Sequence, residues 1–309
     1  MKCSVIVANY NNAATLQQAL QSVEQQTYTN CEVIFVDDAS TDDSVAVFER
    51  WRLSVADKTK YKLVVLEQNK GVGNAKRTAI SGSNGEFIFI LDADDALAPT
   101  ALEDFVTAHA QYPSASLIYS TYYKCDGDLL PKEIEPNTRQ VQFSDLLEDS
   151  ISHLVSFKRQ YYNLTEGFDS SFKLSEDKDL YYKLEEVGDV VFINQPLYNY
   201  RIWNKGISQG FDNYVKSRNY KLTAIDNALK RRKESRIKLP TKTQIHKLLA
   251  EIHLLQAEGL VYSQQPLGSK FLKHLGLAIL YNPTASIIRK LKAVFVLSRA
   301  KRSINRWLS

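Results

Sequence analysis

The first 120 residues alternate short apolar runs, rich in β-branched residues, with segments whose apolar positions recur at helical spacing. The apolar runs cover residues 3–9, 32–36, 62–66 and 87–91. The helical patterns cover residues 16–23, 45–51, 75–80 and 101–111. A chain that alternates strand with helix in this way predicts an α/β fold, in which helices cover both faces of a mainly parallel sheet.

Polar residues follow these apolar runs at the points where the strands are expected to end. Tyr10 follows the first run, Asp37 and Asp38 follow the second, and the acidic residues of 92–95 follow the fourth. Open α/β sheets bind their ligands in the crevice beyond the carboxyl ends of the strands. We therefore expect these side chains to line one binding site.

The acidic cluster at residues 92–95, Asp-Ala-Asp-Asp, comes directly after a fully apolar run. Several carboxylates at one strand tip repel one another, and a divalent cation compensates that repulsion. Oxygen-rich clusters suit Mg²⁺ or Mn²⁺, which can also bridge a diphosphate. The alternative is a solvated acidic turn before a helix that starts near Thr100, and the cluster alone does not separate the two.

The acidic pair Asp37 and Asp38 precedes a segment with natural helix caps, Ser40 and Thr41 among them. Capping does not require two acids at the strand tip itself. A carboxylate there can accept a hydrogen bond from a nucleobase N–H or a ribose hydroxyl. Tyr10 could stack on that base, although packing within the loop is the alternative for this tyrosine.

Five segments, in this order and spacing, resemble glycosyltransferase family 2, the inverting enzymes of the GT-A fold. They are SVIVANYNN, VDDAST, NKGVGNAKRTAI, ILDADD and LSEDKDLYYKL. The resemblance covers residues 3–208 and implies a GT-A (Rossmann-like) mixed, mainly parallel sheet flanked by helices, with a C-terminal helical extension. It favours the non-processive bacterial type, because the Gln-x-x-Arg-Trp motif of processive synthases has no counterpart. The Arg-Trp pair near the end of the sequence, Arg306-Trp307, has Ser303 in the glutamine position.

The resemblance implies residues that bind the nucleotide sugar. Asp38 would hold the uracil or other base, Asp37 would assist, and Tyr10 would lie beside the base. Lys76 and Arg77 could contact phosphate, although a turn followed by an amphipathic helix explains the lysine equally well.

The resemblance also implies the metal ligands and the catalytic residues. Asp92 would contact the ribose, and Asp94 would bind Mn²⁺ or Mg²⁺, with Asp95 as the alternative ligand. Glu176 and Asp177 match the family's Glu-Asp pair, in which the aspartate removes the proton of the acceptor hydroxyl. The alternative reading of that pair is two acids favoured by the dipole at a helix N-terminus.

Two further segments have implied roles on the acceptor and leaving-group sides. Gly167-Phe168-Asp169 resembles the family's acceptor-side loop. Arg201 would steady the leaving diphosphate. Tyrosines are dense between these segments, and we expect the acceptor to bind there.

Charge divides the chain into regions of opposite sign. Residues 1–209 hold 19 Lys and Arg against 30 Asp and Glu, whereas residues 210–309 hold 20 against 5. We expect a nucleotide-sugar-binding half at 1–120, an acceptor-binding and catalytic-base half at 121–209, and a basic helical region at 210–309. The segment 285–309 predicts a basic amphipathic helix, which either lies on an anionic membrane or packs on protein.

The expected activity is transfer of a sugar, with a UDP-sugar favoured as donor, to a hydroxyl of a glycan or lipid-linked acceptor. Sugar-phosphate nucleotidyl transfer is an alternative, but it calls for a Gly-rich basic loop after the first strand. A non-catalytic carbohydrate-binding role would leave Asp177 without a purpose. Nucleic acid is not an expected partner.

The sequence favours a cytoplasmic protein. Its three cysteines form no CxxC pair, and no apolar run reaches the roughly 20 residues needed to cross a bilayer. Any contact with a membrane is therefore expected at its surface.

Overall fold

A computed structural model describes residues 1–142, 151, 153–202, 211–237, 239–262 and 269–281. The chain divides into two compact units, one of residues 1–143 and 148–204, the other of residues 144–147 and 205–309. The basic segment 285–309, for which an amphipathic helix is predicted, lies outside the described residues.

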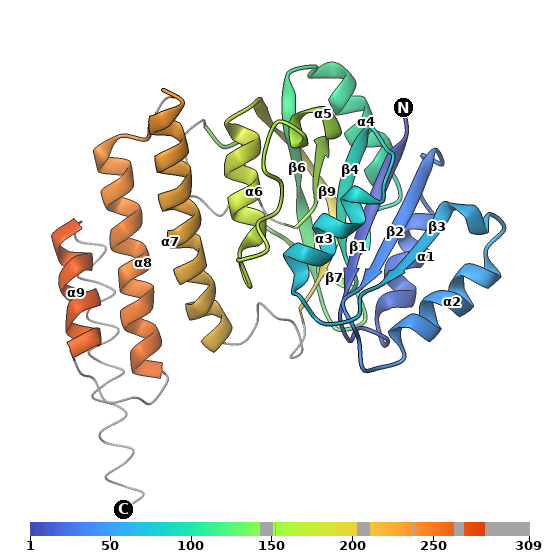
Figure 1. The fold of residues 1–309 in the computed structure, drawn as a ribbon, viewed down its shortest axis with the longest axis horizontal. Coiled ribbons are helices and arrows are strands. Elements are labelled where there is room, and N and C mark those ends of the chain that lie inside the picture. Colours follow the sequence, from blue (N-terminus) through green and yellow to red (C-terminus); the bar gives the residue numbers. More distant parts are fainter. Residues whose placement is uncertain (143–150, 152, 203–210, 238, 263–268, 282–309) are drawn as a thin grey trace, which may run out of the picture. The chain divides into compact units, whose positions relative to one another are not determined.

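One mixed sheet forms the centre of the first unit (Figure 1). Among the described residues it has nine strands, in the order β3-β2-β1-β4-β8-β6-β9-β5, with β7 paired to β6. The strands are β1 (Cys3–Asn9), β2 (Cys31–Asp37), β3 (Tyr61–Val65), β4 (Phe87–Asp92), β5 (Ala96–Leu97), β6 (Ala115–Cys125), β7 (Pro131–Ile134), β8 (Val155–Lys158) and β9 (Asp189–Arg201). The first four strands along this order pair in parallel, as the βα alternation predicts. The direction changes at β8, which runs antiparallel to both β4 and β6.

Helices cover both faces of this sheet, because alternate strand residues point to opposite sides. Val5 and Phe35 belong to a core shared with α1, α2 and α4, whereas Ile6 and Ile34 belong to a second core shared with α3 and α6. The helices are α1 (Leu16–Glu24), α2 (Ser44–Ser54), the short 3₁₀ turn η1 (Lys58–Lys60), α3 (Val72–Ser81), α4 (Ala101–Gln111), α5 (Arg159–Tyr162) and α6 (Glu176–Glu185). The predicted α/β architecture is therefore confirmed.

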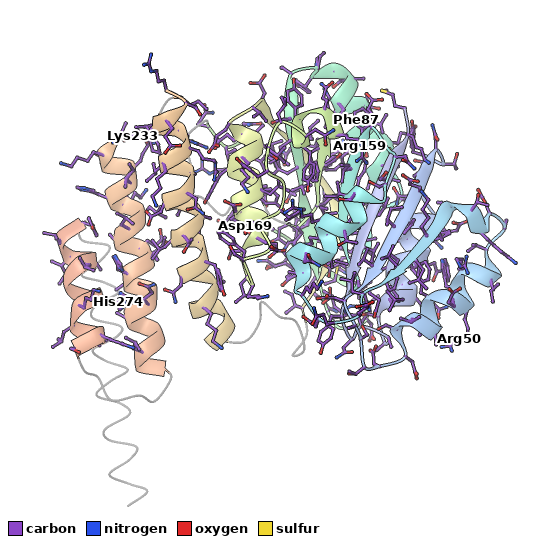
Figure 2. All side chains as sticks on the ribbon, in the orientation of Figure 1. Arg50, Phe87, Arg159, Asp169, Lys233 and His274 are labelled. Atoms are coloured by element: carbon purple, nitrogen blue, oxygen red, sulfur yellow. The ribbon has the colours of Figure 1, made fainter. Side chains whose placement is uncertain are left out.

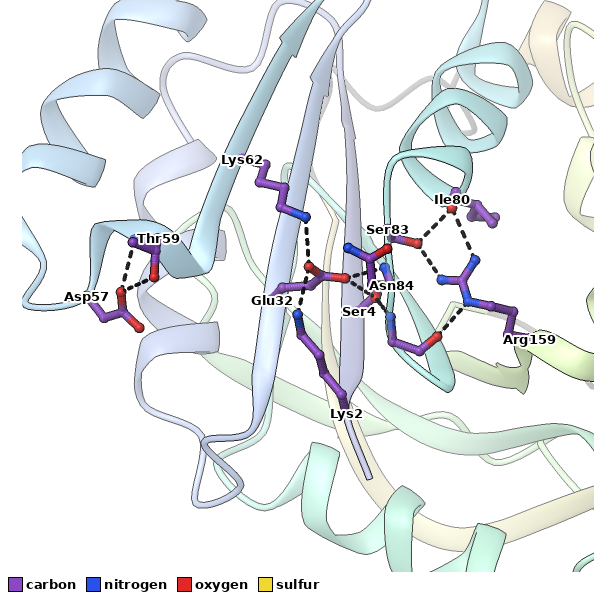
Figure 3. A network of polar contacts seen from close by, with 11 residues as sticks. Lys2, Ser4, Glu32, Asp57, Thr59, Lys62, Ile80, Ser83, Asn84 and Arg159 are labelled. Carbon is purple, nitrogen blue, oxygen red and sulfur yellow. Dashed lines mark hydrogen bonds and ion pairs between the residues drawn. The ribbon is translucent and has the colours of Figure 1, made fainter.

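A polar network ties the strands together at the amino end of the parallel sheet, away from the predicted site (Figure 3). The buried carboxylate of Glu32 accepts hydrogen bonds from the Ser4 hydroxyl at 2.8 Å and from the ammonium groups of Lys2 and Lys62 at 3.0 Å each. The guanidinium of Arg159 donates to the Gly85 carbonyl at 2.7 Å. These contacts fix the starts of the strands whose other ends carry the candidate site.

The second unit is helical, as predicted for the C-terminal region. It contains α7 (Phe211–Glu234), α8 (Lys242–Tyr262) and α9 (Ser269–Tyr281). His274 of α9, which is labelled in Figure 2, places its Nδ1 atom 3.1 Å from that of His253 of α8. Over the part of the chain that the structure describes, no helix combines the length and the apolar character needed to cross a bilayer.

Candidate functional site

The carboxyl ends of three parallel strands bring the predicted donor-side residues to one edge of the sheet. In the strand register, Asn9 of β1 pairs with Asp37 of β2, and Ala8 of β1 pairs with Asp92 of β4. Tyr10 follows directly and is 44% exposed. The structure thus places the residues that were predicted from the ends of β1, β2 and β4 on one edge.

Asp37 closes the loop that follows β2. Its buried carboxylate accepts hydrogen bonds from the Asn9 amide at 2.8 Å, from the Ser40 hydroxyl at 2.6 Å and from the Ser40 backbone N–H at 2.8 Å. These bonds connect the ends of β1 and β2. Asp37 therefore stabilises the loop between β2 and α2, and its predicted help in holding a base stays a prediction.

Asp38 is held by the turn that leads into α3. Its two carboxylate oxygens accept the backbone N–H groups of Lys70 and Gly71, at 2.8 and 2.7 Å. Gly71 has a φ of +93°, which side chains with a Cβ rarely adopt. Each carboxylate oxygen has a second lone pair, so Asp38 can still accept a hydrogen bond from a base.

Two carboxylates and one imidazole form a group that could hold a metal ion. Asp92, Asp95 and His153 each offer one ligand atom, and these atoms lie within 4.8 Å of one another. Burial raises the pKa of Asp95, and the neighbouring charges of Asp94 and Asp92 raise it further. This excess of negative charge, next to a nitrogen ligand, fits a divalent cation. Asp94 itself is half-buried in the same turn.

His153 reaches this group from the segment that precedes β8. Its ring stacks on Tyr200, with centroids 3.8 Å apart, and meets the Tyr122 ring edge to face at 4.5 Å. Burial lowers the pKa of His153 to about 4, against the opposing influence of Asp92. The imidazole is therefore neutral at pH 7 and can offer a lone pair.

Asp95 is anchored by the end of β9. Its carboxylate accepts the Tyr198 hydroxyl and the Arg201 backbone N–H, both at 2.8 Å. The Arg201 guanidinium donates to the Asp94 carbonyl at 2.6 Å, to Gln18 Oε1 at 2.7 Å and to the Gly127 carbonyl. Arg201 is 2% exposed and holds the acidic turn in place, and its predicted contact with a leaving diphosphate stays a prediction.

A buried ion pair connects the acidic cluster with the start of α6. The Lys76 ammonium lies 3.0 Å from Glu176 Oε1 and 3.7 Å from Asp92 Oδ1. Burial lowers the pKa of Lys76, but the charges of Glu176, Asp92 and Asp177 outweigh it and raise the pKa above its ordinary value. Burial raises the pKa of Glu176, the Lys76 charge opposes that shift, and the Asp177 charge adds to it.

Asp177, the predicted base, is half-buried in the first turn of α6. The charges of Asp92 and Asp177 both oppose the lowering of the His153 pKa by burial. The Arg77 guanidinium donates to the Phe168 carbonyl at 3.4 Å, and its predicted contact with phosphate stays a prediction. Asp169, labelled in Figure 2, follows Phe168 in the loop before α6, and its carboxylate accepts a hydrogen bond from the Ser171 backbone N–H.

Two residues of this site were not found from the sequence. The histidines show no spacing typical of a metal site, so nothing in the pattern indicates that His153 joins the acidic cluster. Tyr198 is one tyrosine in a tyrosine-rich region. Both reach the site through β8 and β9, whose pairing with the rest of the sheet the βα alternation does not predict.

Comparison with known proteins gives a consistent result. The model of the family described as Glycosyl transferase family 2 matches residues 4–164, just over half of the chain. Chondroitin synthase from Escherichia coli is 31% identical over 200 residues, which are 63% of this chain. The matched part is 28% of that relative's length, so the chain spans less than a third of it.

Solved structures share the fold. S. aureus TarS 1–349 in complex with UDP-GlcNAc superposes with a TM-score of 0.64 at 20% identity, covering 91% of this chain and 81% of that one. The mannosyltransferase PcManGT from Pyrobaculum calidifontis, in complex with GDP-Man and Mn²⁺, gives a TM-score of 0.61 at 17% identity. That match covers 97% of this chain and 86% of the other.

Proposed function

Because the chain belongs to glycosyl transferase family 2, we propose that it moves a sugar, with inversion, from a nucleoside diphosphate donor to an acceptor hydroxyl. The observation that carries the proposal is the convergence at one sheet edge. The carboxylate–imidazole group lies near the first turn of α6, which holds Asp177, because Lys76 pairs both with Asp92, at 3.7 Å, and with Glu176, at 3.0 Å. Transfer of this kind needs both a charge-stabilised diphosphate and a general base.

A UDP-sugar is the favoured donor. Asp38 would accept a hydrogen bond from the base, and the exposed ring of Tyr10 would stack on it. Two fold relatives support a nucleotide-sugar donor, since their structures hold UDP-GlcNAc and GDP-Man. Asp92, at the end of β4, would contact the ribose, while Asp37 keeps the loop closed.

Mn²⁺ or Mg²⁺ is the proposed cofactor. Asp94 or Asp95 would hold it, and the group that Asp95 forms with Asp92 and His153 offers donor atoms that suit such an ion. A bound cation would stabilise the negative charge that develops on the leaving diphosphate. Arg201 and Tyr198 keep the acidic turn in the shape that this binding needs.

Asp177 is the proposed general base. Its carboxylate takes the proton of the acceptor hydroxyl while the oxygen attacks the anomeric carbon from the face opposite the diphosphate. Glu176 belongs to the same motif, but its carboxylate is engaged in an ion pair with Lys76. We therefore assign the proton transfer to Asp177 alone.

A glycan or a lipid-linked glycan is the proposed acceptor, in the synthesis of a cell-surface polysaccharide or glycoconjugate. The E. coli chondroitin synthase relative supports a role in polysaccharide synthesis. The basic segment 285–309 would hold the protein at the cytoplasmic face of an anionic membrane, close to such acceptors.

The direct test offers the purified protein a panel of UDP- and GDP-sugars with Mn²⁺ and follows release of the nucleoside diphosphate. Asp177→Asn should lower the rate by about 10²- to 10⁴-fold, the usual contribution of a general base. Asp94→Ala should lower it by weakening metal binding. Asp43→Asn, an exposed aspartate before α2, is the matched control and should leave the rate unchanged. Turnover unaffected by Asp177→Asn and Asp94→Ala would overturn the mechanism.

A further inference from the structure

The Lys76 side chain is buried, whereas a lysine that binds a phosphate of the donor has to be accessible to it. The residue is 6% exposed, and the Phe168 ring lies over its ammonium group with the centroid 6.0 Å away. The nearest charged partner is Glu176, at 3.0 Å, and Asp92 follows at 3.7 Å. Lys76 is therefore a buried cation that pairs with two carboxylates, Asp92 and Glu176, from distant parts of the chain.

The same face of α3 makes a second contact with Glu176. Gly73 lies one helical turn before Lys76, and a Cβ at this position would approach the Cβ and Cγ atoms of Glu176 to 3.3 Å. The absence of a side chain at Gly73 therefore lets Glu176 lie directly against α3. Gly73 and Lys76 together form a socket for the Glu176 side chain, which we call the Glu176 socket.

The backbone enters α6 in an unusual conformation at this point. Ser175 has a φ of +58°, in the left-handed region, and Glu176 is the first residue of α6. Such a conformation persists where surrounding contacts hold it. The Glu176 socket supplies one such contact, and the next residue along the chain is Asp177.

We propose that Lys76 is a positioning residue, which fixes Asp177 by holding Glu176 against α3 and links that base to the acidic turn through Asp92. The inference rests on the proposed function, because it names the group that orients the proposed base. It differs from the sequence expectation, in which Lys76 contacts a phosphate of the donor.

The experiment compares Lys76→Met, Lys76→Arg and the control Lys58→Met, which neutralises an exposed lysine of η1. Calorimetry with UDP and Mn²⁺ measures nucleotide binding, and hydrogen exchange measures protection of the first-turn amides of α6. With the donor and acceptor pair that supports turnover, steady-state kinetics separates kcat from KM.

A positioning role predicts that Lys76→Met changes the Kd for UDP by less than about threefold but lowers kcat by about 30- to 100-fold, as misplaced catalytic groups do. Exchange at amides 176–180 should quicken by about tenfold or more, because local opening becomes easier. Lys76→Arg should recover most of both losses, and Lys58→Met should show neither.

Two results would overturn the inference. One is a Kd for UDP raised at least tenfold by Lys76→Met with an unchanged kcat, which is the behaviour of a phosphate ligand. The other is unchanged exchange at residues 176–180. Should Lys76→Met fail to fold, Glu176→Gln and Glu176→Ala replace it: the glutamine keeps an acceptor for Lys76 and should lower kcat less than the alanine does, and equal losses would overturn the inference. If the wild-type chain transfers no sugar, the proposed function fails, and the exchange measurement still tests Lys76.

Discussion

Tyr198 donates its hydroxyl to the carboxylate of Asp95 at 2.8 Å, and thereby joins β9 to the acidic turn after β4. Both groups are buried. Replacing Tyr198 with Phe keeps the ring but removes the donor, which leaves a buried carboxylate oxygen without this partner. We expect a loss of about 1–3 kcal/mol in the free energy of unfolding, measured by urea denaturation. Tyr112→Phe, at an exposed tyrosine, is the control, and equal stabilities for the two variants would contradict the expectation.

His153→Phe tests the imidazole as a metal ligand. The phenyl ring preserves the stack on Tyr200 but offers no lone pair. We expect the Kd for Mn²⁺ to rise by at least about tenfold, the size of effect seen when groups around a metal site are removed. Calorimetry with Mn²⁺ and UDP measures it. His246→Phe, in the helical unit, should leave Mn²⁺ binding unaltered. If both variants bind Mn²⁺ like the wild type, His153 is not a ligand.

Gly71→Ala tests the turn that holds Asp38. A Cβ at a φ of +93° strains the backbone by about 1–3 kcal/mol, and the strain disturbs the N–H group that Asp38 accepts. We expect a lower free energy of unfolding and weaker UDP binding. Gly82→Ala is the matched control, because Gly82 has a φ of −85° and an added Cβ would make only ordinary contacts, at 3.7 Å. The prediction fails if the two alanine variants behave alike.

Much of the first half of the site could be predicted from the sequence, for a physical reason. Parallel strands of a βα alternation end at one edge, so Asp38 and Asp92 had to lie at the same edge of the sheet once β2 and β4 were recognised. The partner of Lys76 could not be predicted in the same way. Helical spacing on α3 indicates which face is buried, but the identity of the opposing group depends on where α6 lies. For His153, the antiparallel addition of β8 decides the position, and periodicity carries no information on strand order.

Acid should weaken the fold through Glu32. Burial raises the pKa of Glu32, but hydrogen bonds from Asn84, Ser4, Lys62 and Lys2 outweigh burial and lower it from 4.5 to about 2. The resulting stabilisation is complete above pH 4.5 and is lost as the pH falls towards 2. Urea denaturation of the wild type and of Glu32→Gln should therefore converge across this window. A constant difference between pH 6 and 2.5 would show that Glu32 does not cause the loss.

His109 should add a second, separate dependence on pH. Burial and the nearby charge of Lys158 lower the pKa of His109 from 6.5 to about 3. The unfolded chain takes up this proton near pH 6.5 and the folded chain does not until about pH 3, so stability should decline as the pH falls between these values. His109→Phe keeps a ring against Phe87 and should remove this part of the decline. The variant and the wild type should show equal slopes above pH 7.

The contacts of Arg201 affect how the chain folds while it is being synthesised. Its guanidinium joins Gln18, Asp94 and Gly127, so the last strand of the sheet stabilises segments that leave the ribosome far earlier. A nascent chain that ends at residue 164, the limit of the family match, would contain the acidic turn but neither Asp177 nor the β9 donors of Asp95. The candidate site therefore becomes complete only after residue 201 has been synthesised, and fragments trimmed to the matched segment should lack activity and be less stable.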